Sequence, residues 1–458
     1  MKFSDDTIAA ISTATGNSGI SIIRISGKNA YDIAQKIYKG KNISFSDIKN
    51  KTIRYGHIID VVSGNIIDEV LISRMDAPNT YTGENVVEIN AHGGATVAGK
   101  VLKTTLDAGA RLANPGEFTK RAFLNSRIDL IQAEAVMDII NAKTDYSLSA
   151  AQERLTGHLS ENINSIKNIL LDALSYIGVG IEYPEYDIEE TEQENILSLL
   201  NNACDKLNKL YNSYKKGQIL NEGLKVAIVG KPNVGKSLLL NDLTNSDRSI
   251  VTDIPGTTRD IVSEMINIGG IPIKIIDTAG IRQSENKVEQ IGISRSIDAI
   301  EKAQVVIFVL DISRKWDKED EEILSLLKHK DTIYVANKND LKSDEEIIKR
   351  LKDYDIIYIS ALTKDGIEKV EEKIKEFSGL KAEDVINEAI VANVRHENLI
   401  KNALISLKSA IDGIGNNTVI DMAEIDIKDC LDCIYEITGQ AIDDDIIDRI
   451  FANFCLGK

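Results

Sequence analysis

The sequence predicts a multidomain protein with three parts: an α+β domain at the N-terminus, a discontinuous all-α helical domain, and an α/β P-loop domain inserted into the helical one. Three observations predict this arrangement. Apolar residues alternate as in strands, with two helical stretches, over the first 118 positions. After position 118 the apolar residues recur with the spacing of an α-helix. A glycine-rich strand-to-helix pattern near residue 230 interrupts the helical region, which resumes near residue 380.

The expected domain boundaries follow from these changes of period. The N-terminal domain covers residues 1–118, the helical domain covers 119–220 and 380–458, and the inserted domain covers 221–379. A chain of 458 residues is long enough for several domains. Inserted domains leave and re-enter at exposed hinges, so we expect relative motion, with residues 217–223 as a hinge.

The composition argues against a membrane-spanning, a secreted or a disulfide-rich protein. No apolar run approaches the length of a membrane span, and the N-terminus lacks a signal-peptide pattern. The four cysteines, Cys204, Cys430, Cys433 and Cys455, are too few and too scattered for a disulfide framework, so we expect a cytoplasmic protein. The net charge of −17 argues against a broad, self-sufficient nucleic-acid surface.

Periodicity predicts the elements of the two outer domains. Strands are expected at residues 8–12, 20–25, 52–59, 70–75 and 86–91, and helices at 30–38, 96–108 and 193–216. Cys204 lies on the apolar stripe of the last helix and is expected in the core. Cys430 and Cys433 are spaced like a metal or redox pair. No second pair lies nearby and the pattern around them is helical, so packing is the favoured interpretation.

The P-loop is the strongest motif. A β-branched run at residues 226–229 predicts a buried strand, and residues 230–237 match G-x-x-x-x-G-K-[ST] before a helix starts near Leu238. Backbone N–H groups and the helix N-terminus bind phosphate oxygens in such a loop, Lys236 reaches the β- and γ-phosphates, and Ser237 binds Mg²⁺. A turn that serves only tight packing is the alternative, which the order of strand, motif and helix disfavours.

Three further motifs, each after a predicted strand, indicate that the nucleotide is GTP. Residues 337–340 match N-K-x-D, in which the Asp340 carboxylate accepts the N1 and N2 hydrogens of guanine. Residues 360–362 match a loop that offers a backbone N–H to guanine O6, and residues 277–280 match the D-x-x-G switch. The predicted GTP-binding residues are Asn233, Val234, Gly235, Lys236, Ser237, Leu238, Thr252, Asp253, Ile254, Pro255, Gly256, Thr257, Thr258, Asp277, Thr278, Ala279, Gly280, Asn337, Lys338, Asp340, Ser360, Ala361 and Leu362.

The switch region narrows the type of G domain. Ile281 stands where Ras-like G domains carry the Gln that orients water, so another group must stabilise the transition state. The P-loop Asn233 and residues 252–260 resemble those of potassium-activated GTPases. That resemblance implies an inserted Ras-like G domain with Mg²⁺ on Ser237 and Thr258, and K⁺ on Asn233, Thr252, Ile254 and Thr257. The alternative, that Asn233 only orders the switch loop, stays open.

Motifs outside the G domain resemble one family over essentially the whole chain. They include Tyr81-Thr82-Gly83-Glu84, Pro115-Gly116-Glu117-Phe118-Thr119-Lys120-Arg121 and the tail Phe454-Cys455-Leu456-Gly457-Lys458. Together they resemble the tRNA modification GTPase MnmE (TrmE) family. One departure is residues 14–19, where the family usually has a Pro-Pro-Gly-Arg-Gly-Gly-like loop.

The resemblance implies addition of an aminomethyl or carboxymethylaminomethyl group to C5 of the wobble uridine of certain tRNAs. It implies a one-carbon unit from 5,10-methylene- or 5-formyl-tetrahydrofolate, a homodimer, and a heterotetramer with an FAD-containing partner of the MnmG (GidA) type. The N-terminal domain would then be a folate-binding-like and dimerisation domain. The implied folate contacts are Arg24, Glu88, Arg127 and Lys458, although each residue taken alone is more often a surface charge.

Two catalytic residues are also implied. Glu289 falls where the family places a Glu that positions the attacking water indirectly; by sequence alone it is one more acidic residue on a helix. For Cys455 a frayed chain end is the ordinary interpretation. However, Ile447, Phe451 and Phe454 form a helical apolar stripe that would dock the last turn, so we predict that Cys455 acts at the modification site.

A GTP-dependent ribosome assembly factor is the rival hypothesis. Such a factor is a binding switch with a similar G domain and without its own carbon chemistry. It typically carries basic RNA-binding domains, whereas this chain has a folate-binding-like N-terminus and a Cys455 tail. The sequence therefore favours the modification enzyme.

Overall fold

The computed structural model describes most of the chain, in two compact units. It describes residues 6–14, 16, 18–41, 43–182, 190–246, 264–276, 297–381, 389–416 and 420–458. For residues 179–182, 190–192, 245–246 and 420–421 it describes the backbone but not the side chains. Unit 1 holds the described residues of Met1–Met137 and Tyr435–Lys458, and unit 2 those of Asp138–Ile434. This division groups residues by contact; the domain boundaries expected from the sequence stay predictions.

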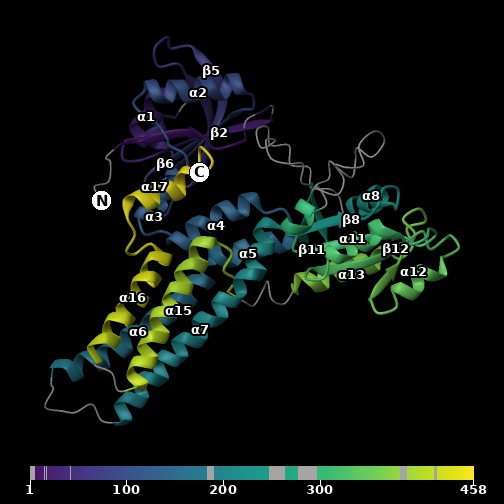
Figure 1. Ribbon diagram of the computed structural model, residues 1–458. Coiled ribbons are helices and arrows are strands. Elements are labelled where there is room, and N and C mark those ends of the chain that lie inside the picture. Colours follow the sequence, from purple (N-terminus) through teal and green to yellow (C-terminus); the bar gives the residue numbers. More distant parts are fainter. Residues whose placement is uncertain are drawn as a thin grey trace. The chain divides into compact units, whose positions relative to one another are not determined.

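A seven-stranded sheet forms the centre of unit 1, in the order β3-β4-β5-β6-β2-β1-β7 (Figure 1). All neighbouring strands are antiparallel except β1 and β7. The strands are β1 (Ile8–Ile11), β2 (Ile20–Ser26), β3 (Tyr38–Gly40), β4 (Thr52–Ile59), β5 (Ile66–Met75), β6 (Val86–His92) and β7 (Arg111–Leu112). The five predicted strands are confirmed. β5 starts earlier than expected because Asp68 and Glu69 contact His92 and His57 of the neighbouring strands.

Helices cover one face of this sheet and, near β1, part of the other. Its helices are α1 (Ala30–Ile37), the 3-10 helix η1 (Phe45–Asp47), α2 (Ala95–Asp107), α3 (Glu117–Leu124), the first part of α4 (Leu130–Asn141), and α17 (Asp444–Ala452). The apolar sides of α1 and α2 bury Ile33 and Val101 against Ile72 and Ile89 of the strands. On the opposite side, Phe118 of α3 packs against Ile8, Ala10 and Ala113.

The chain end is docked in unit 1, as the apolar stripe predicts. Ile447, Phe451 and Phe454 are buried against Leu130 and Ala133. Beyond α17, the Gly116 and Phe118 amides donate to the carbonyls of Cys455 (3.3 Å) and Lys458 (3.2 Å). Gly457 has φ 91°, and a Cβ there would lie 2.2 Å from the Ile11 carbonyl oxygen. Only glycine permits this close approach of the tail to β1.

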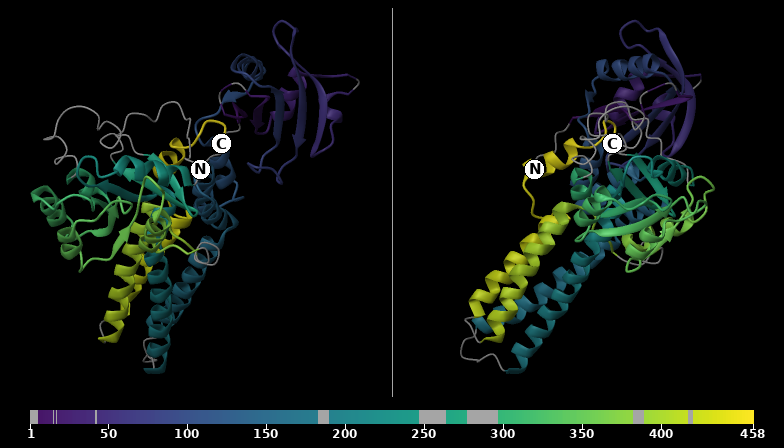
Figure 2. Two further views of the ribbon diagram at one scale, coloured as in Figure 1. Left: turned by 90° about the vertical axis from the view of Figure 1, so that its right-hand side faces the viewer. Right: turned by 45° about the vertical axis from the view of Figure 1, so that its right-hand side comes forward.

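Long helices side by side form the first part of unit 2 (Figures 1 and 2). They are α6 (His158–Glu182), α7 (Glu190–Glu222), α15 (Val394–Gly415) and α16 (Ile420–Thr438), with the shorter α5 (Asp145–Thr156). Cys204 and Cys430 are buried among them, which confirms the packing interpretation, and burial raises the pKa of the Cys430 thiol. None of the described helices combines the length and hydrophobicity needed to cross a bilayer.

The hinge expected at residues 217–223 is wrong. The helix α7 continues through Glu222 because Ile219 and Leu220 are buried and pack with Leu224 of the next strand. Gly217 serves close packing: a Cβ there would lie 2.0 Å from the Val391 carbonyl oxygen. Gly217 therefore allows the backbone at Val391 to pack closely against α7, and it does not interrupt the helix.

A six-stranded sheet in the order β13-β12-β11-β8-β10-β9 forms the second part of unit 2. Its strands are β8 (Leu224–Val229), β9 (Glu264–Ile268), β10 (Ile271–Ile276), β11 (Val305–Asp311), β12 (Asp331–Asn337) and β13 (Ile356–Tyr358). Its helices are α8 (Lys236–Ser246), α11 (Lys318–Leu326), α12 (Glu345–Arg350) and α13 (Ile367–Ser378). All pairs are parallel except β9 with β10.

Both faces of this sheet are buried. Alternate residues of β8 and β11 enter different cores: Val226 and Ile307 lie in one, Ala227 and Phe308 in the other. Such continuous apolar strands are typical of a parallel sheet covered by helices on both sides. The multidomain fold class predicted from the sequence, with α+β, discontinuous all-α and inserted α/β P-loop parts, is confirmed.

Candidate functional site

The P-loop lies at the carboxyl end of β8, where open parallel sheets bind ligands. Two glycines give it its shape. Gly230 has φ 148°, and a Cβ there would lie 2.3 Å from the Val309 carbonyl oxygen. Gly235 has φ 103°, and a Cβ there would lie 2.1 Å from the side-chain Nδ2 of Asn337. Neither position tolerates a side chain, so the loop depends on both glycines of the motif.

Lys236 begins α8 and turns back over the loop. Its Nζ donates to the carbonyl oxygens of Gly230 and Lys231, both at 2.7 Å. Burial lowers the pKa of Lys236 to about 8, because desolvation disfavours the ammonium form. A phosphate placed in the loop would restore a counter-charge to this ammonium.

Asn337, the first residue of the N-K-x-D motif, joins three loops. It ends β12 and is almost fully buried. Its Nδ2 donates to the Val234 carbonyl of the P-loop at 2.7 Å, and its Oδ1 accepts the Ala361 amide at 2.9 Å. One side chain thus fixes the phosphate loop and the loop of residues 360–362 relative to each other.

The remaining residues of the N-K-x-D motif are held by short hydrogen bonds. The Ser360 hydroxyl donates to the Asp340 carboxylate at 2.6 Å. Lys338, with φ 67°, donates to the buried Asp311 carboxylate at 2.6 Å. Burial by itself raises the pKa of Asp311, but the hydrogen bonds from Lys338 and Ser313 outweigh it, and the net pKa lies below its usual value. Asp311 therefore stays charged and holds Lys338 beside Asp340.

The other predicted GTP-binding residues are divided by what the structure describes. Asn233 has φ 62° and is exposed at the P-loop, Val234 is buried, Ser237 is half-buried, and Leu238 and Leu362 are exposed. The structure brings together all predicted residues of 233–238, 337–340 and 360–362. The predicted residues that lie outside the described part of the chain are Thr252, Asp253, Ile254, Pro255, Gly256, Thr257, Thr258, Asp277, Thr278, Ala279, Gly280 and Glu289.

In unit 1 the predicted folate residues form a second cluster. Arg24 of β2 and Glu88 of β6 are opposite each other in the sheet, and Arg24 Nε lies 2.9 Å from Glu88 Oε1. Both side chains are half-buried, with 15% of Arg24 and 25% of Glu88 exposed. The pair presents an acceptor and a donor side by side, which suits a pterin ring, a molecule with both kinds of group on its edge.

Tyr81 is the residue that the sequence reasoning missed. The guanidinium carbons of Arg24 and Arg127 each lie 5.2 Å from the centroid of its ring. The Arg127 Nη1 also donates to the Tyr81 carbonyl oxygen at 3.0 Å. The Arg24 guanidinium is 5.6 Å from the Phe118 ring as well. An aromatic residue before Thr-Gly gives only a weak signal in a sequence, because nothing local reveals which cations will reach it.

The chain end completes this cluster. The Lys458 carbonyl accepts the amide of Phe118, the residue whose ring contacts Arg24. Cys455 is exposed, and its backbone is tied to Gly116. The structure therefore brings Arg24, Glu88, Arg127 and the Lys458 backbone together around Tyr81 and Phe118.

A buried ion network supports α3 beneath the cluster. Arg121 is 7% exposed, and its guanidinium lies 2.7 Å from Asp6, 3.1 Å from Glu84 and 3.0 Å from Glu117. Burial alone would lower the pKa of Arg121, but these carboxylates raise it overall. Burial likewise tends to raise the pKa of Glu117, and Arg111 and Arg121 bring it below its usual value. Arg121 and Glu117 therefore stay charged, and the ion pairs of Arg121 fix α3 against the loop that carries Tyr81.

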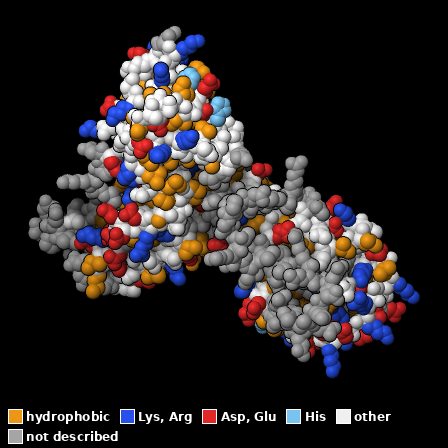
Figure 3. Space-filling model, turned by 90° about the horizontal axis from the view of Figure 1, so that it is seen from above, with side chains coloured by type: hydrophobic (Ala, Val, Ile, Leu, Met, Phe, Trp, Pro, Cys, Tyr) orange, Lys and Arg blue, Asp and Glu red, His pale blue; other side chains and the backbone are white. Residues whose placement is uncertain are grey.

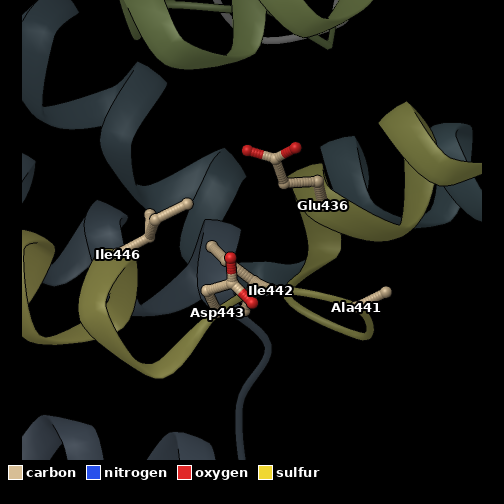
Figure 4. A pocket seen from close by; sticks show the side chains of 5 residues that line it. All are labelled: Glu436, Ala441, Ile442, Asp443 and Ile446. Carbon is tan, nitrogen blue, oxygen red and sulfur yellow. The ribbon is translucent and has the colours of Figure 1, made fainter.

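Within unit 1, the described residues also form an open pocket of about 380 Å³ at the end of α16, the start of α17 and the residues between them, all from Tyr435 onward (Figure 4). Its lining is Glu436, Ala441, Ile442, Asp443 and Ile446. None of these is a predicted site residue, and no cluster of described His, Cys, Asp and Glu side chains is arranged to hold a metal ion. Hydrophobic side chains also reach the surface among charged ones, as Figure 3 shows.

Comparison with known proteins gives matches along the chain. The family model described as "GTP-binding protein TrmE N-terminus" matches residues 7–127, and "MnmE helical domain" matches 130–455. A solved G domain, that of the T. maritima FeoB iron transporter, covers 34% of this chain and 98% of its own, at 25% identity and a TM-score of 0.24.

Curated relatives match over their full length. A protein of Acetivibrio thermocellus is 46% identical over 459 residues, with all of both chains covered. One of Clostridioides difficile is 46% identical over 462 residues, again with full coverage of both. One of Lactococcus lactis subsp. cremoris is 46% identical over 457 residues, covering 99% of this chain and 98% of its own. All three are named tRNA modification GTPase MnmE, and with this identity over the whole length the chain belongs to that family.

Proposed function

We propose that this chain is a GTPase that acts in wobble uridine modification of tRNA. The observation that carries the proposal is the convergence of Lys236, Asn337 and Asp340 at one sheet edge, in a chain whose relatives are named for that activity. Family membership also favours this function over the alternative, a GTP-dependent ribosome assembly factor. The proposed place of action is the cytoplasm.

Each part of the G site has a proposed task. Lys236 and the P-loop amides bind the β- and γ-phosphates, and Ser237 with Thr258 binds Mg²⁺. Asp340 accepts the guanine N–H groups, while Ser360 keeps its carboxylate in place. Asn337 holds the phosphate and base loops at a fixed spacing. In this proposal, one loop binds the phosphates and others bind the guanine base, and the buried Asn337 side chain connects these loops.

Potassium activation is the proposed answer to Ile281 replacing the water-orienting Gln. Asn233 is exposed at the P-loop and available as a K⁺ ligand, with Thr252, Ile254 and Thr257 as its proposed companions and Glu289 positioning water. Hydrolysis should be slow in Na⁺ and faster in K⁺. Asn233→Ala should lose that difference, and Glu289→Ala should lose hydrolysis while still binding nucleotide. Equal rates in both salts for the unaltered chain would contradict potassium activation.

The cluster in unit 1 is the proposed folate site. The donors and acceptors fit a reduced folate. Glu88 suits the N–H edge of its pterin ring. Arg24, Arg127 and Lys458 suit the pterin carbonyl or the carboxylates of the glutamate tail. The folate would supply the one-carbon unit. Cys455 is exposed and its backbone carbonyl is bound by Gly116 before α3; its thiol is proposed to act there.

A homodimer and a larger complex complete the proposal. Ile20, Ile53, Tyr55 and Leu71 are exposed on strands β2, β4 and β5. Strand register places them on the sheet face that carries Arg24 and Glu88. Such apolar patches mark association surfaces. We expect Leu71→Glu to lower the mass in light scattering from that of a dimer to that of one chain. The FAD-containing MnmG (GidA)-type partner follows from family membership.

Nucleoside analysis tests the whole function. A strain lacking this gene should lack the aminomethyl and carboxymethylaminomethyl wobble uridines in mass spectrometry of its tRNA, and the intact gene should restore them. Restoration by a Lys236→Ala gene would contradict a role for the GTPase. Normal nucleosides together with defective ribosomal subunits in the deletion strain would favour the assembly factor.

A further inference from the structure

Two arginine side chains meet at the ring of Tyr81. Its ring has the guanidinium groups of Arg24 and Arg127 at equal distances of 5.2 Å. These two arginines come from distant parts of the chain, β2 and the residues after α3. They share one aromatic ring and belong to the proposed folate site.

Three kinds of contact fix Tyr81 itself. Its hydroxyl lies 2.8 Å from the Thr119 hydroxyl on α3. Its side chain packs against the buried Ile8, Ala10 and Phe118. Its carbonyl accepts a hydrogen bond from Arg127. The ring is therefore a rigid surface, whereas an arginine side chain has many rotamers that must be restricted before it can bind a ligand.

An aromatic ring attracts a guanidinium through its quadrupole and leaves the N–H groups at the guanidinium edge for other acceptors. Two cations near one ring repel each other, and the ring's attraction offsets part of that repulsion. Holding both arginines in place before the ligand arrives lowers the entropy cost of binding.

We propose that Tyr81 is the positioning residue of the folate site: its ring holds Arg24 and Arg127 so that both guanidinium groups meet the acceptor groups of one reduced folate. This inference rests on the proposed folate function. The ring carries the effect, and the hydroxyl serves only to anchor it. Arg127 depends on Tyr81 more than Arg24 does, because Arg24 also has the Phe118 ring and Glu88.

Calorimetry with 5-formyltetrahydrofolate on the full-length chain tests the proposal. Tyr81→Phe keeps the ring and should bind within about twofold of the unaltered chain. Tyr81→Leu and Tyr81→Met remove the ring and should bind about three- to tenfold more weakly, as expected for loss of cation–π contacts. Tyr176→Leu, an exposed tyrosine of α6, is the control for the same chemical change elsewhere. Thermal melting identifies any variant that has lost its fold.

A double-mutant cycle separates positioning from general damage. Arg127→Gln removes the cation, and the hydrogen bond to the backbone of residue 81 does not depend on the ring, so the cycle reports the ring contact. With Tyr81→Met, the loss in the double variant should be clearly smaller than the product of the single losses. The same cycle with Arg24→Gln should show less coupling.

The outcomes are distinguishable. No folate binding by the unaltered chain overturns the folate proposal. Binding by the unaltered chain with equal affinity in Tyr81→Leu and Tyr81→Met, or multiplicative losses in the Arg127 cycle, overturns the positioning role of Tyr81 and leaves the folate site standing.

Discussion

The nucleotide site and the folate cluster are built in different ways. In the G domain, loops at the ends of parallel strands supply the site, and the side chain of Asn337 connects two of them by bonding backbone atoms of each. In unit 1, Arg24 of β2 and Arg127, which follows α3, meet at the ring of Tyr81, while Glu88 of β6 pairs with Arg24 and the tail is joined to α3 through backbone hydrogen bonds. Short sequence motifs predict the first kind of site, because each of its loops consists of consecutive residues. The second depends on contacts between distant side chains.

The largest expected effect is at Asn337. Asn337→Ala leaves the buried Val234 carbonyl and Ala361 amide without their partner, at roughly 1–3 kcal/mol for each group. The unfolding free energy should fall by about 2–6 kcal/mol, the sum for the two groups, and GTP affinity should fall with it. Denaturant unfolding and nucleotide titration measure both quantities.

Asn339→Ala is the matched control for that change, since Asn339 is the exposed third residue of the same motif. It should alter neither quantity. Folate binding should be intact in both variants because the folate cluster lies in the other unit. Equal behaviour of the two variants would remove Asn337 from its connecting role.

Asp340→Asn sharpens the nucleotide side of the comparison. The change replaces a charge-assisted acceptor by an amide donor, at a cost of roughly 1.5–3 kcal/mol, or about ten- to a hundredfold in GTP affinity. Xanthosine triphosphate, whose O2 accepts the new donor, should gain relative to GTP. Competition between the two nucleotides measures the change, and an unaltered preference for GTP would exclude Asp340 as the guanine reader.

The pH dependence of GTP binding is the next effect in size. Burial lowers the pKa of free Lys236 to about 8, and bound phosphates favour its charged form, so the pKa rises on binding. Binding above pH 8 then takes up a proton. The affinity should be flat from pH 7 to 8 and fall above pH 8, by at most about tenfold per pH unit.

Guanosine, which lacks phosphates but carries the same titratable N1–H, is the control for this titration, and the loss that Lys236 causes is the extra fall of GTP affinity beyond that of guanosine. Isothermal titration in buffers of different ionisation enthalpy should detect the proton taken up with GTP. A GTP affinity that stays constant from pH 8 to 10 would contradict a neutralised Lys236 in the free protein.

How far the sequence predicted each site follows from this difference. The strands, the P-loop and the N-K-x-D residues were predicted because periodicity and contiguous motifs report them directly. The connection through Asn337 needed the structure, since Val234 and Ala361 lie far apart in the chain. For the folate cluster, the residues came from family resemblance, and Tyr81 was missed because its two arginines reach it only in the folded unit.

The hinge was the wrong prediction for a related reason. Gly217 and Gly223 suggested a break, but Ile219 and Leu220 are buried and carry α7 through to Glu222. Tertiary burial there outweighs the weak helix preference of glycine.

The smallest expected effect tests the folate side. Glu88→Gln removes a partly exposed ion pair with Arg24, and such pairs contribute about 0–1 kcal/mol, so the melting temperature should barely change. Folate affinity should nevertheless fall, while GTP affinity should not. Calorimetry with both ligands on one preparation checks this, and a loss of GTP binding would contradict the separation of the two sites.

The most direct test of the central claim, that one chain carries two chemically separate sites, is Cys455→Ser. The exposed thiol lies in the docked tail of unit 1, whereas Lys236, Asn337 and Asp340 lie in unit 2. GTP hydrolysis should proceed at its usual rate, and mass spectrometry of tRNA from cells carrying only this variant should find no modified wobble uridine. Normal levels of the modified nucleoside would contradict the account and leave Cys455 as a structural residue of the chain end.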